Sequence, residues 1–309
     1  MTPSGAASSA RLREDPDEAA PVEDRLLAGT DFSERGNDAV LVAFAMARRI
    51  SASVDLFHAV DPTPLPRSGF GLVDRLLGRR PNPERQAEEA RRKLEELDRW
   101  AGRPDAGIHV EFGEPGEVLA ELRNRLQPSL VILWSAEPLS VRNLVAPTSL
   151  ADRALYRGSC PLLLVRHPPP GGLFRRILVC VENPNLVTPW LEAALRIANQ
   201  LVGEIIVLHV RPPRGYGSDA HHVDLSPGTT GKRLEALVQR IDPELPAQLD
   251  IEQGDAAYVI PQRALAHKAD LVVLGAELSP TGWPGRVADH VATADLPSTL
   301  FVWPPKAES

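Results

Sequence analysis

The chain has 309 residues, of which 43% are hydrophobic and 24% are charged, a composition typical of a soluble globular protein with room for two domains. Its formal net charge of −7 argues against nucleic acid as a partner, because no basic field gathers phosphates. No apolar stretch reaches the roughly 18 residues that a bilayer-spanning segment needs, so we expect no membrane partner.

The N-terminal segment and the cysteines indicate the compartment. Residues 1–22 lack the hydrophobic segment of a signal peptide and are rich in Ala, Ser, Asp, Glu and Pro, which predicts a disordered tail. Cys160 and Cys180 lie in or beside apolar runs and are interpreted as small core residues of a reducing environment. These features together predict a cytoplasmic protein.

From residue 23 onward, short apolar runs alternate with helical patterns. Strands are predicted near 25–30, 53–60, 107–112, 129–134 and 161–166, and again near 175–181, 204–210, 247–252, 269–274 and 298–302. Helices are predicted near 35–50, 82–101, 115–127 and 149–157, and again near 187–202, 229–241, 255–267 and 285–294. Continuous runs such as "LVVL" are typical of parallel strands covered on both faces. The predicted fold is therefore α/β, with two tandem doubly wound domains of five parallel strands each.

The second half of the chain repeats the first. The matching segments are "RLLAGTD" and "RILVCVE" at an offset of 151, "SVDLFHAV" and "GEIIVLHV" at 150, "LVIL" and "LVVL" at 141, and "ADRAL" and "ADHVA" at 137. The falling offset indicates shorter connections in the second copy. A "HPPPGG" stretch separates the copies. We therefore place the first domain at 23–168, a linker at 169–172, the second domain at 173–304 and a tail at 305–309.

Ligands of doubly wound sheets bind beyond the carboxyl ends of the strands, where the winding direction reverses. If the fourth strand of each domain lies beside the first, the loops that follow these two strands face each other. In that case "GTDFS" meets "WSAEP" in the first domain, and "CVENP" meets "GAELS" in the second. The sequence therefore predicts one candidate crevice in each domain.

A family resemblance covers about 23–168 and 173–304. Two first strands that each end in an acidic residue, "LFHAV" and "VLHV" second strands, a glycine-bearing loop after strand 4, and last strands opened by proline ("CPLLLVR" and "LPSTLFV") resemble the universal stress proteins. The resemblance implies a pseudo-twofold arrangement in which the two last strands pair. Nucleotide-binding members carry an Asp after strand 1 and a Gly-x2-Gly-x9-Gly-Ser/Thr loop after strand 4. Such a loop lets backbone amides and a helix N-terminus approach phosphates.

The first copy keeps only part of that motif. Asp31 and Ser33 stand in "GTDFS", but Trp134 and Glu137 occupy the places of the first two loop glycines. Trp134 would fill the space that the phosphates need. Glu137 would repel each unit of phosphate charge by about 3 kcal/mol, at an effective dielectric of about 20 and a separation of roughly 5 Å. The resemblance therefore implies that the usual ATP binding is lost in the first domain.

The second copy is altered rather than filled. It keeps Gly275 and a helix start at 285–286, but Leu278 replaces the second glycine. Glu182 and Pro184 replace the Asp and the Ser of the first copy. Arg286 could pair with a phosphate or a carboxylate at the start of the helix. No cofactor is predicted, and ATP in the second domain stays an alternative.

The candidate ligand-binding residues come from both copies and include the ends of the second strands. They are Asp31, Ser33, Val60, Thr148, Ser149, Val210, Gly275, Gly285 and Arg286. Asp31 has two interpretations, a ribose contact or the cap of the helix that begins near Ser33, and the altered loop opposite favours the cap. His58 and His209 occupy equivalent strand ends, where a hydrogen-bonded core histidine is the commoner role. No metal-ligand spacing, catalytic triad order, P-loop or dinucleotide fingerprint is present, so no catalytic or metal residue is predicted.

Three functions follow from these observations. The leading hypothesis is a non-catalytic tandem stress protein that senses a small ligand or binds partner proteins, with its halves forming an intrachain pseudo-dimer. The second is an ATP- or AMP-binding protein with weak ATPase activity in the second copy. The third is a carrier of an apolar small molecule, suggested by Trp and Leu in place of glycines. A further homodimer is left open, and the insertion at 65–85 is interpreted as a flap over the crevice or a docking helix.

Overall fold

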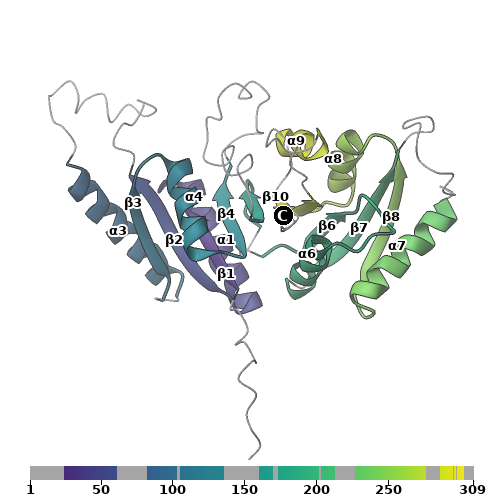
Figure 1. Ribbon diagram of the computed structural model, residues 1–309, viewed down its shortest axis with the longest axis horizontal. Coiled ribbons are helices and arrows are strands. Elements are labelled where there is room, and N and C mark those ends of the chain that lie inside the picture. Colours follow the sequence, from purple (N-terminus) through teal and green to yellow (C-terminus); the bar gives the residue numbers. More distant parts are fainter. Residues whose placement is uncertain are drawn as a thin grey trace, which may run out of the picture.

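One sheet of ten strands runs through the whole molecule, in the order β3-β2-β1-β4-β5-β10-β9-β6-β7-β8 (Figure 1). The computed structural model describes residues 24–60, 82–102, 105–135, 160–169, 173–201, 203–212, 227–275, 286–294, 296 and 298–302. The strands are β1 (Arg25–Gly29), β2 (Ser53–Val60), β3 (Gly107–Phe112), β4 (Leu130–Trp134), β5 (Leu162–Val165), β6 (Arg176–Cys180), β7 (Glu204–Arg211), β8 (Ala247–Gln253), β9 (Leu271–Gly275) and β10 (Ser298–Val302). Each half contributes five strands that are parallel within the half, as predicted.

The two halves meet through their last strands. β5 and β10 pair antiparallel, with Val165 opposite Ser298 and Leu162 opposite Phe301. The strand order on one side of this pair is repeated in mirror sequence on the other, which confirms the predicted pseudo-twofold arrangement. Two arginines add contacts across the join: Arg166 Nη1 donates to Ala294 O at 2.6 Å, and Arg49 Nε donates to Gln200 O at 3.0 Å.

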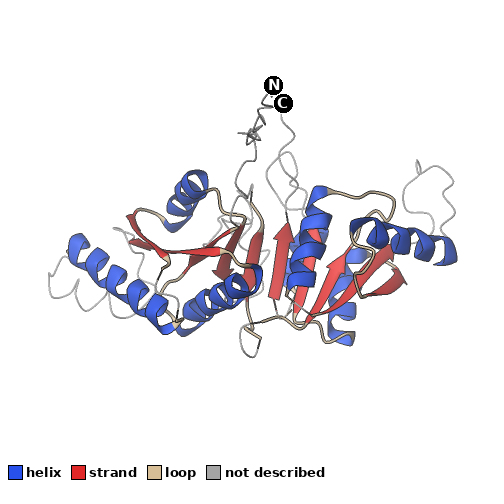
Figure 2. Cartoon of the chain, turned by 90° about the horizontal axis from the view of Figure 1, so that it is seen from below, coloured by secondary structure: helices blue, strands red, loops and turns tan. Residues whose placement is uncertain are grey.

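Helices cover both faces of the sheet, which makes the architecture doubly wound (Figure 2). One face packs against α1 (Glu34–Ile50), α3 (Pro83–Trp100), α6 (Pro189–Gln200) and α7 (Pro227–Ile241), and the other against α4 (Pro115–Leu126), α8 (Ala256–Ala266) and α9 (Arg286–Thr293). Alternate strand residues therefore enter different cores: Leu26 and Ala28 belong to the first, whereas Leu27 belongs to the second. The helix predicted at 149–157 and most of the 65–85 insertion lie outside the described residues.

Side-chain caps explain where several helices begin. Ser33, Asn82, Thr188 and Asp255 each accept a hydrogen bond from a backbone N–H of the first turn of the helix that follows. α3, α4 and α6 also carry proline in their first turn, where the missing N–H has no partner to lose. Within the described part of the chain, no helix combines the length and apolarity needed to cross a bilayer.

The strand register corrects one predicted correspondence between the copies. β1 and β2 pair Arg25 with Ser53, while β6 and β7 pair Arg176 with Glu204. Ser53 therefore corresponds to Glu204, and the offset of these strands is 151 rather than 150. The carbonyl of Val60 accepts from Gly113 N at 3.1 Å, and its true counterpart, the carbonyl of Arg211, accepts from Gly254 N at 2.9 Å. Arg211, and not Val210, is thus the equivalent of Val60.

Candidate functional site

The carboxyl ends of β1, β2 and β4 lie together at the edge of the sheet where the crevice of the first half is predicted. β1 lies between β2 and β4, with both pairs parallel, so the loops after β1 and β4 start side by side as expected. The same relation holds for β6 and β9 in the second half. α1 begins at this edge of the first half, and its N-terminus carries the partial positive charge of a helix dipole.

The loop from Thr30 to Ser33 is held by its own side chains. The Thr30 hydroxyl donates to Asn37 Oδ1 at 3.0 Å and accepts from Phe32 N at 2.9 Å. Asp31 Oδ1 accepts from Ser33 N at 2.9 Å and from Ser33 Oγ at 2.5 Å. Ser33 Oγ in turn accepts from Gly36 N at 3.0 Å and is the N-cap of α1. The predicted cap role of Asp31 is therefore corrected: Ser33 caps the helix, and Asp31 orients the Ser33 hydroxyl.

Close packing of α1 against this loop requires glycine at position 36. A Cβ atom there would lie 2.4 Å from Asp31 Oδ1 and 3.0 Å from Thr30 Oγ1. Phe32 turns the chain with φ of 63°, in the left-handed region that non-glycine residues rarely adopt. The loop thus combines backbone strain with a tight hydrogen-bond network, both of which fix the start of α1.

Two aromatic rings with adjacent cations line the crevice side of α1. The Phe32 ring lies 4.4 Å from the His58 ring, centroid to centroid, and Lys93 Nζ lies 5.2 Å from the Phe32 centroid. Arg35 Cζ lies 6.0 Å from the centroid of the Trp134 ring at the end of β4. These separations allow cation–π attraction, and Lys93 Nζ also lies 3.0 Å from Glu89 Oε1 on the same helix.

His58, on β2, is hydrogen-bonded to the backbone at the start of the Thr30–Ser33 loop. Its Nδ1 lies 2.8 Å from Thr30 O, and a carbonyl only accepts, so Nδ1 carries the proton. Burial lowers the pKa of His58, and the hydrogen bond to Thr30 O opposes that shift only in part. His209 makes the same contact to Val181 O at 2.9 Å, and burial likewise lowers its pKa. The predicted role of both residues as hydrogen-bonded core histidines is confirmed.

Trp134 packs toward α1 rather than into solvent. Its partly buried ring lies against the core on the α1 side of the sheet, and its Nε1 is buried without a hydrogen-bond partner among the described residues. Val60, another candidate, is buried at the end of β2. Glu137, Thr148 and Ser149 lie outside the described residues. At the strand ends where the first crevice is predicted, the structure therefore places Trp134 with Arg35, and Phe32 with His58 and Lys93.

The second half presents a different edge. α6 begins at Pro189, four residues later than the position equivalent to the start of α1, so its N-terminus lies about one turn, or ~6 Å, farther along. Asn183 Oδ1 accepts from Asn185 N at 2.9 Å in the lengthened loop. Gly275 is exposed at the end of β9, and Val210 is half-buried. Arg286 begins α9 with only its backbone described, and Gly285 lies outside the described residues.

The candidate residues form two separate sets rather than one site. Four strands lie between β1 and β6, which at about 4.8 Å per step puts the two crevices roughly 24 Å apart. Arg35 and Lys93 were not among the sequence candidates. Arg35 could have been suggested by its place in the first turn after "TDFS", whereas Lys93 reaches the crevice only through the packing of α3.

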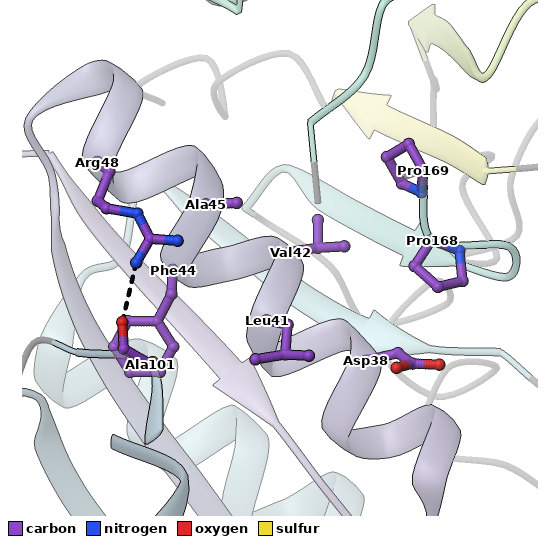
Figure 3. Close-up of a pocket in the computed structure, with 9 residues that line it drawn as sticks. All are labelled: Asp38, Leu41, Val42, Phe44, Ala45, Arg48, Ala101, Pro168 and Pro169. Carbon is purple, nitrogen blue, oxygen red and sulfur yellow. Dashed lines mark hydrogen bonds between the residues drawn. The ribbon is translucent and has the colours of Figure 1, made fainter. Parts of the chain in front are cut away.

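A groove of about 330 Å³ lies along α1, and none of the residues that line it belongs to the loops after β1 and β4 (Figure 3). Its lining residues are Asp38, Leu41, Val42, Phe44, Ala45, Arg48, Ala101, Pro168 and Pro169. Arg48 Nη1 donates to Ala101 O at 2.9 Å at one end, and Asp38, whose pKa is raised chiefly by burial, stands toward the other (Figure 3). Apolar side chains lie between these charges. Among the described residues, no group of three or more His, Cys, Asp or Glu side chains is placed to hold a metal ion.

Comparisons with known proteins agree with this architecture. A model described as the Universal stress protein family matches residues 23–166 and again residues 173–292. The comparison with curated protein sequences gives no significant match. A universal stress protein from Archaeoglobus fulgidus DSM 4304 is 15% identical, with 90% of this chain and 98% of that chain covered and a TM-score of 0.66. A putative universal stress protein from Pseudomonas aeruginosa UCBPP-PA14 is 17% identical, with coverage of 92% and 94% and a TM-score of 0.59. At these identities the two structures support the fold alone.

Proposed function

The chain belongs to the universal stress protein family, in tandem form, and from that premise we propose that it is a non-catalytic member that senses a small ligand or binds partner proteins in a stress response. In this proposal the first domain does not bind ATP in the manner of the family's nucleotide-binding members. The second domain keeps an altered site. The cytoplasm is the proposed compartment.

The placement of Trp134 carries the proposal. An indole at the end of β4, packed on the core and approached by Arg35, stands where a glycine would leave room for phosphate oxygens. A nucleotide that used the N-terminus of α1 and the loop after β4 would have to displace this ring. Moving a partly buried tryptophan ring off the core forfeits part of the roughly 1.5–3 kcal/mol that burial of a large apolar side chain contributes, and that loss would come out of the binding free energy.

The state of Asp31 supports the same conclusion. Its Oδ1 atom already accepts two hydrogen bonds from Ser33, one from the backbone and one from the hydroxyl. Only the second oxygen, Oδ2, could accept from a ribose hydroxyl without disturbing this loop, because a ligand that took Oδ1 would release the Ser33 hydroxyl that caps α1. The first crevice is therefore organised to hold its own loop.

The second domain offers weaker phosphate binding for a different reason. The N-terminus of α6 is set back by about one turn, so its partial positive charge acts over a longer distance. Exposed Glu182 follows β6 where Asp31 follows β1, and its charge would oppose an anion. Exposed Gly275 remains the feature that favours a ligand there.

Calorimetric titration with ATP, ADP and AMP tests the proposal on the full chain. We expect no micromolar binding from the first domain, so any heat of binding should disappear in Gly275→Val, which adds a branched side chain at the second crevice. Micromolar binding that survives Gly275→Val and is lost in Asp31→Ala would overturn the proposal. Phosphate release above background with saturating ATP and magnesium or manganese would overturn the non-catalytic assignment.

The α1 groove favours a second candidate function, the carriage of an apolar molecule. Its middle is formed by Leu41, Val42 and Ala45, and its volume of about 330 Å³ is at the lower end of the range of small-molecule sites. Native mass spectrometry of freshly purified protein would detect a retained compound. Loss of that compound in Leu41→Lys would assign it to the groove, and a clean apo mass would count against carriage.

A further inference from the structure

α8 has a second apolar face that the fold leaves exposed. Ala257, Ile260 and Ala264 face the sheet with relative exposures of 1%, 3% and 1%. Tyr258 and Leu265, seven positions apart, are 57% and 65% exposed, and half-buried Pro261 lies between them at helical spacing. An apolar series at i, i+3 and i+7 is the pattern of a helix face that packs against another element.

The first half shows that the fold does not require this face. Asp255 and Glu114 are the equivalent N-caps of α8 and α4, 141 positions apart. The α4 counterparts of Tyr258, Gln262 and Leu265 are therefore Glu117, Glu121 and Asn124, all exposed. The outer face of this helix is thus polar in the first copy and carries exposed apolar residues in the second. The fold does not require these apolar residues, so we look for their role in the second copy alone.

The exposed face of α8 is self-complementary. Tyr258 and Leu265 are centred on the point between Pro261 and Gln262, and Asp255 and Lys268 are centred on the same point. A twofold axis there would bring Tyr258 against Leu265 of a second copy and Asp255 against its Lys268. Antiparallel helices also place the positive end of one helix dipole beside the negative end of the other. Apolar contact, charge and dipole thus agree on one geometry.

Tyr258 is already oriented for such a contact. Its ring lies 4.7 Å from the ring of His290 on the neighbouring helix α9, at an interplanar angle of 60°. α8 and α9 lie side by side on one face of the second half (Figure 1). A ring held by a neighbour loses less conformational freedom on binding than a mobile one, which favours association.

We propose that the Tyr258–Leu265 face of α8 docks a second copy of this chain through an antiparallel α8–α8 contact. The surface is independent of the crevices and of the function proposed for them. With 11 residues, α8 is about 16 Å long, too short to bury the roughly 1,200–2,000 Å² of a standard stable interface by itself. The dimer should therefore be weak and appear only at high protein concentration.

Sedimentation velocity of the full chain over a roughly hundredfold range of concentration tests the contact. The sedimentation coefficient should rise with concentration for the wild type and stay at the monomer value for Tyr258→Glu combined with Leu265→Asn, the residues of α4. Glu117→Gln combined with Glu121→Gln on α4 is the matched control and should associate like the wild type. Unchanged circular dichroism and melting would show that the α8 variant folds.

Site-directed cross-linking tests the proposed axis. Gln262→Cys would place a thiol beside the axis, and mild oxidation should link two chains at least about tenfold faster than in the matched variant Glu121→Cys. Lys268→Glu in the Gln262→Cys background should slow the reaction, and salt should reduce the difference. A wild type that stays monomeric throughout, or equal cross-linking of Gln262→Cys and Glu121→Cys, would overturn the proposal.

Discussion

His58 and His209 make the same hydrogen bond to a backbone carbonyl at equivalent positions in the two halves of the sheet. His58 Nδ1 lies 2.8 Å from Thr30 O, and His209 Nδ1 lies 2.9 Å from Val181 O. Thr30 and Val181 are the first residues after β1 and β6, at the carboxyl ends of these strands. Each histidine thus ties the first loop of its domain to the second strand, and burial lowers the pKa of both.

This pair predicts a loss of stability in mild acid. The pKa of each folded histidine is below the ordinary 6.5, so at pH values below about 6.5 the unfolded chain binds protons that the folded chain excludes. The free energy of unfolding should fall by up to about 1.4 kcal/mol per pH unit for each site, until the pH passes below the folded pKa. Urea unfolding between pH 7.5 and 5 measures this slope.

The matched variant for the pH experiment is His58→Gln with His209→Gln. The glutamine amide can still donate to the carbonyl but does not titrate. Its stability should therefore decline less steeply than that of the wild type below pH 6.5, and each single variant should give an intermediate slope. Identical slopes for the wild type and the double variant would show that the two histidines do not couple to folding.

Gly36→Ala should destabilise the first domain, although alanine normally favours a helix. The added Cβ would lie 2.4 Å from Asp31 Oδ1, so the turn that holds Ser33 must open. We expect a net loss of about 1–2 kcal/mol, since overpacking outweighs the helix preference. Gly228→Ala in α7 is the control, because a Cβ there meets nothing within 4 Å, and it should stabilise by about 0.5–1 kcal/mol. Denaturant unfolding that ranked Gly36→Ala as the more stable variant would contradict the packing of this loop.

The repeated pattern of the sequence was enough to predict the sheet, but not its exact register. Apolar strands and the "HPPPGG" boundary indicated two five-stranded domains, and the last strands do pair. The match of "SVDLFHAV" with "GEIIVLHV" aligned the terminal valines, whereas the backbone aligns His58 with His209. A one-residue shift exchanges the two faces of a strand, so hydrophobic pattern alone could not choose between two similar apolar runs.

The crevice was less predictable because its contacts depend on tertiary structure. Asp31 and Ser33 were identified from "GTDFS", and their mutual hydrogen bond is local. The stacking of Phe32 on His58 requires the left-handed backbone at Phe32, which no propensity favours for a bulky residue. The approach of Lys93 depends on how α3 packs across the strands, a relation between segments far apart in the chain.

Arg166→Met should weaken the join between the halves more than Arg49→Ala. Arg166 is 6% exposed and donates to Ala294 O across the join at 2.6 Å. Leu296 N also donates to that oxygen, at 2.9 Å, so the substitution removes a charged hydrogen bond without leaving the carbonyl unpaired, and it should cost about 1.5–3 kcal/mol. Arg49 also crosses the join, to Gln200 O, but it is exposed, and water can replace its hydrogen bond. Its removal should cost below about 1 kcal/mol. Urea unfolding of both variants measures the difference, and equal losses would contradict the assignment of the buried contact as the stronger one.

The two cysteines should be unreactive in the folded chain because their thiols stay protonated. This effect can be distinguished by experiment from poor access of a reagent to the thiol. Burial raises the pKa of the half-buried Cys160 thiol to about 11, and its Sγ donates to Pro128 O at 3.0 Å. Burial also raises the pKa of Cys180, which lies in the core. At pH 8 only about one Cys160 thiol in a thousand is then ionised, against about one in ten at the ordinary pKa of 9.0. Labelling by an aromatic disulfide reagent should therefore be about 100-fold slower than in urea.

The native rate of labelling should rise nearly tenfold per pH unit between pH 8 and 10 if ionisation limits it, because the fraction of thiolate grows by that factor. A rate that is fast at pH 8, or flat across this range, would show that the Cys160 thiol is not held in its protonated form by its surroundings.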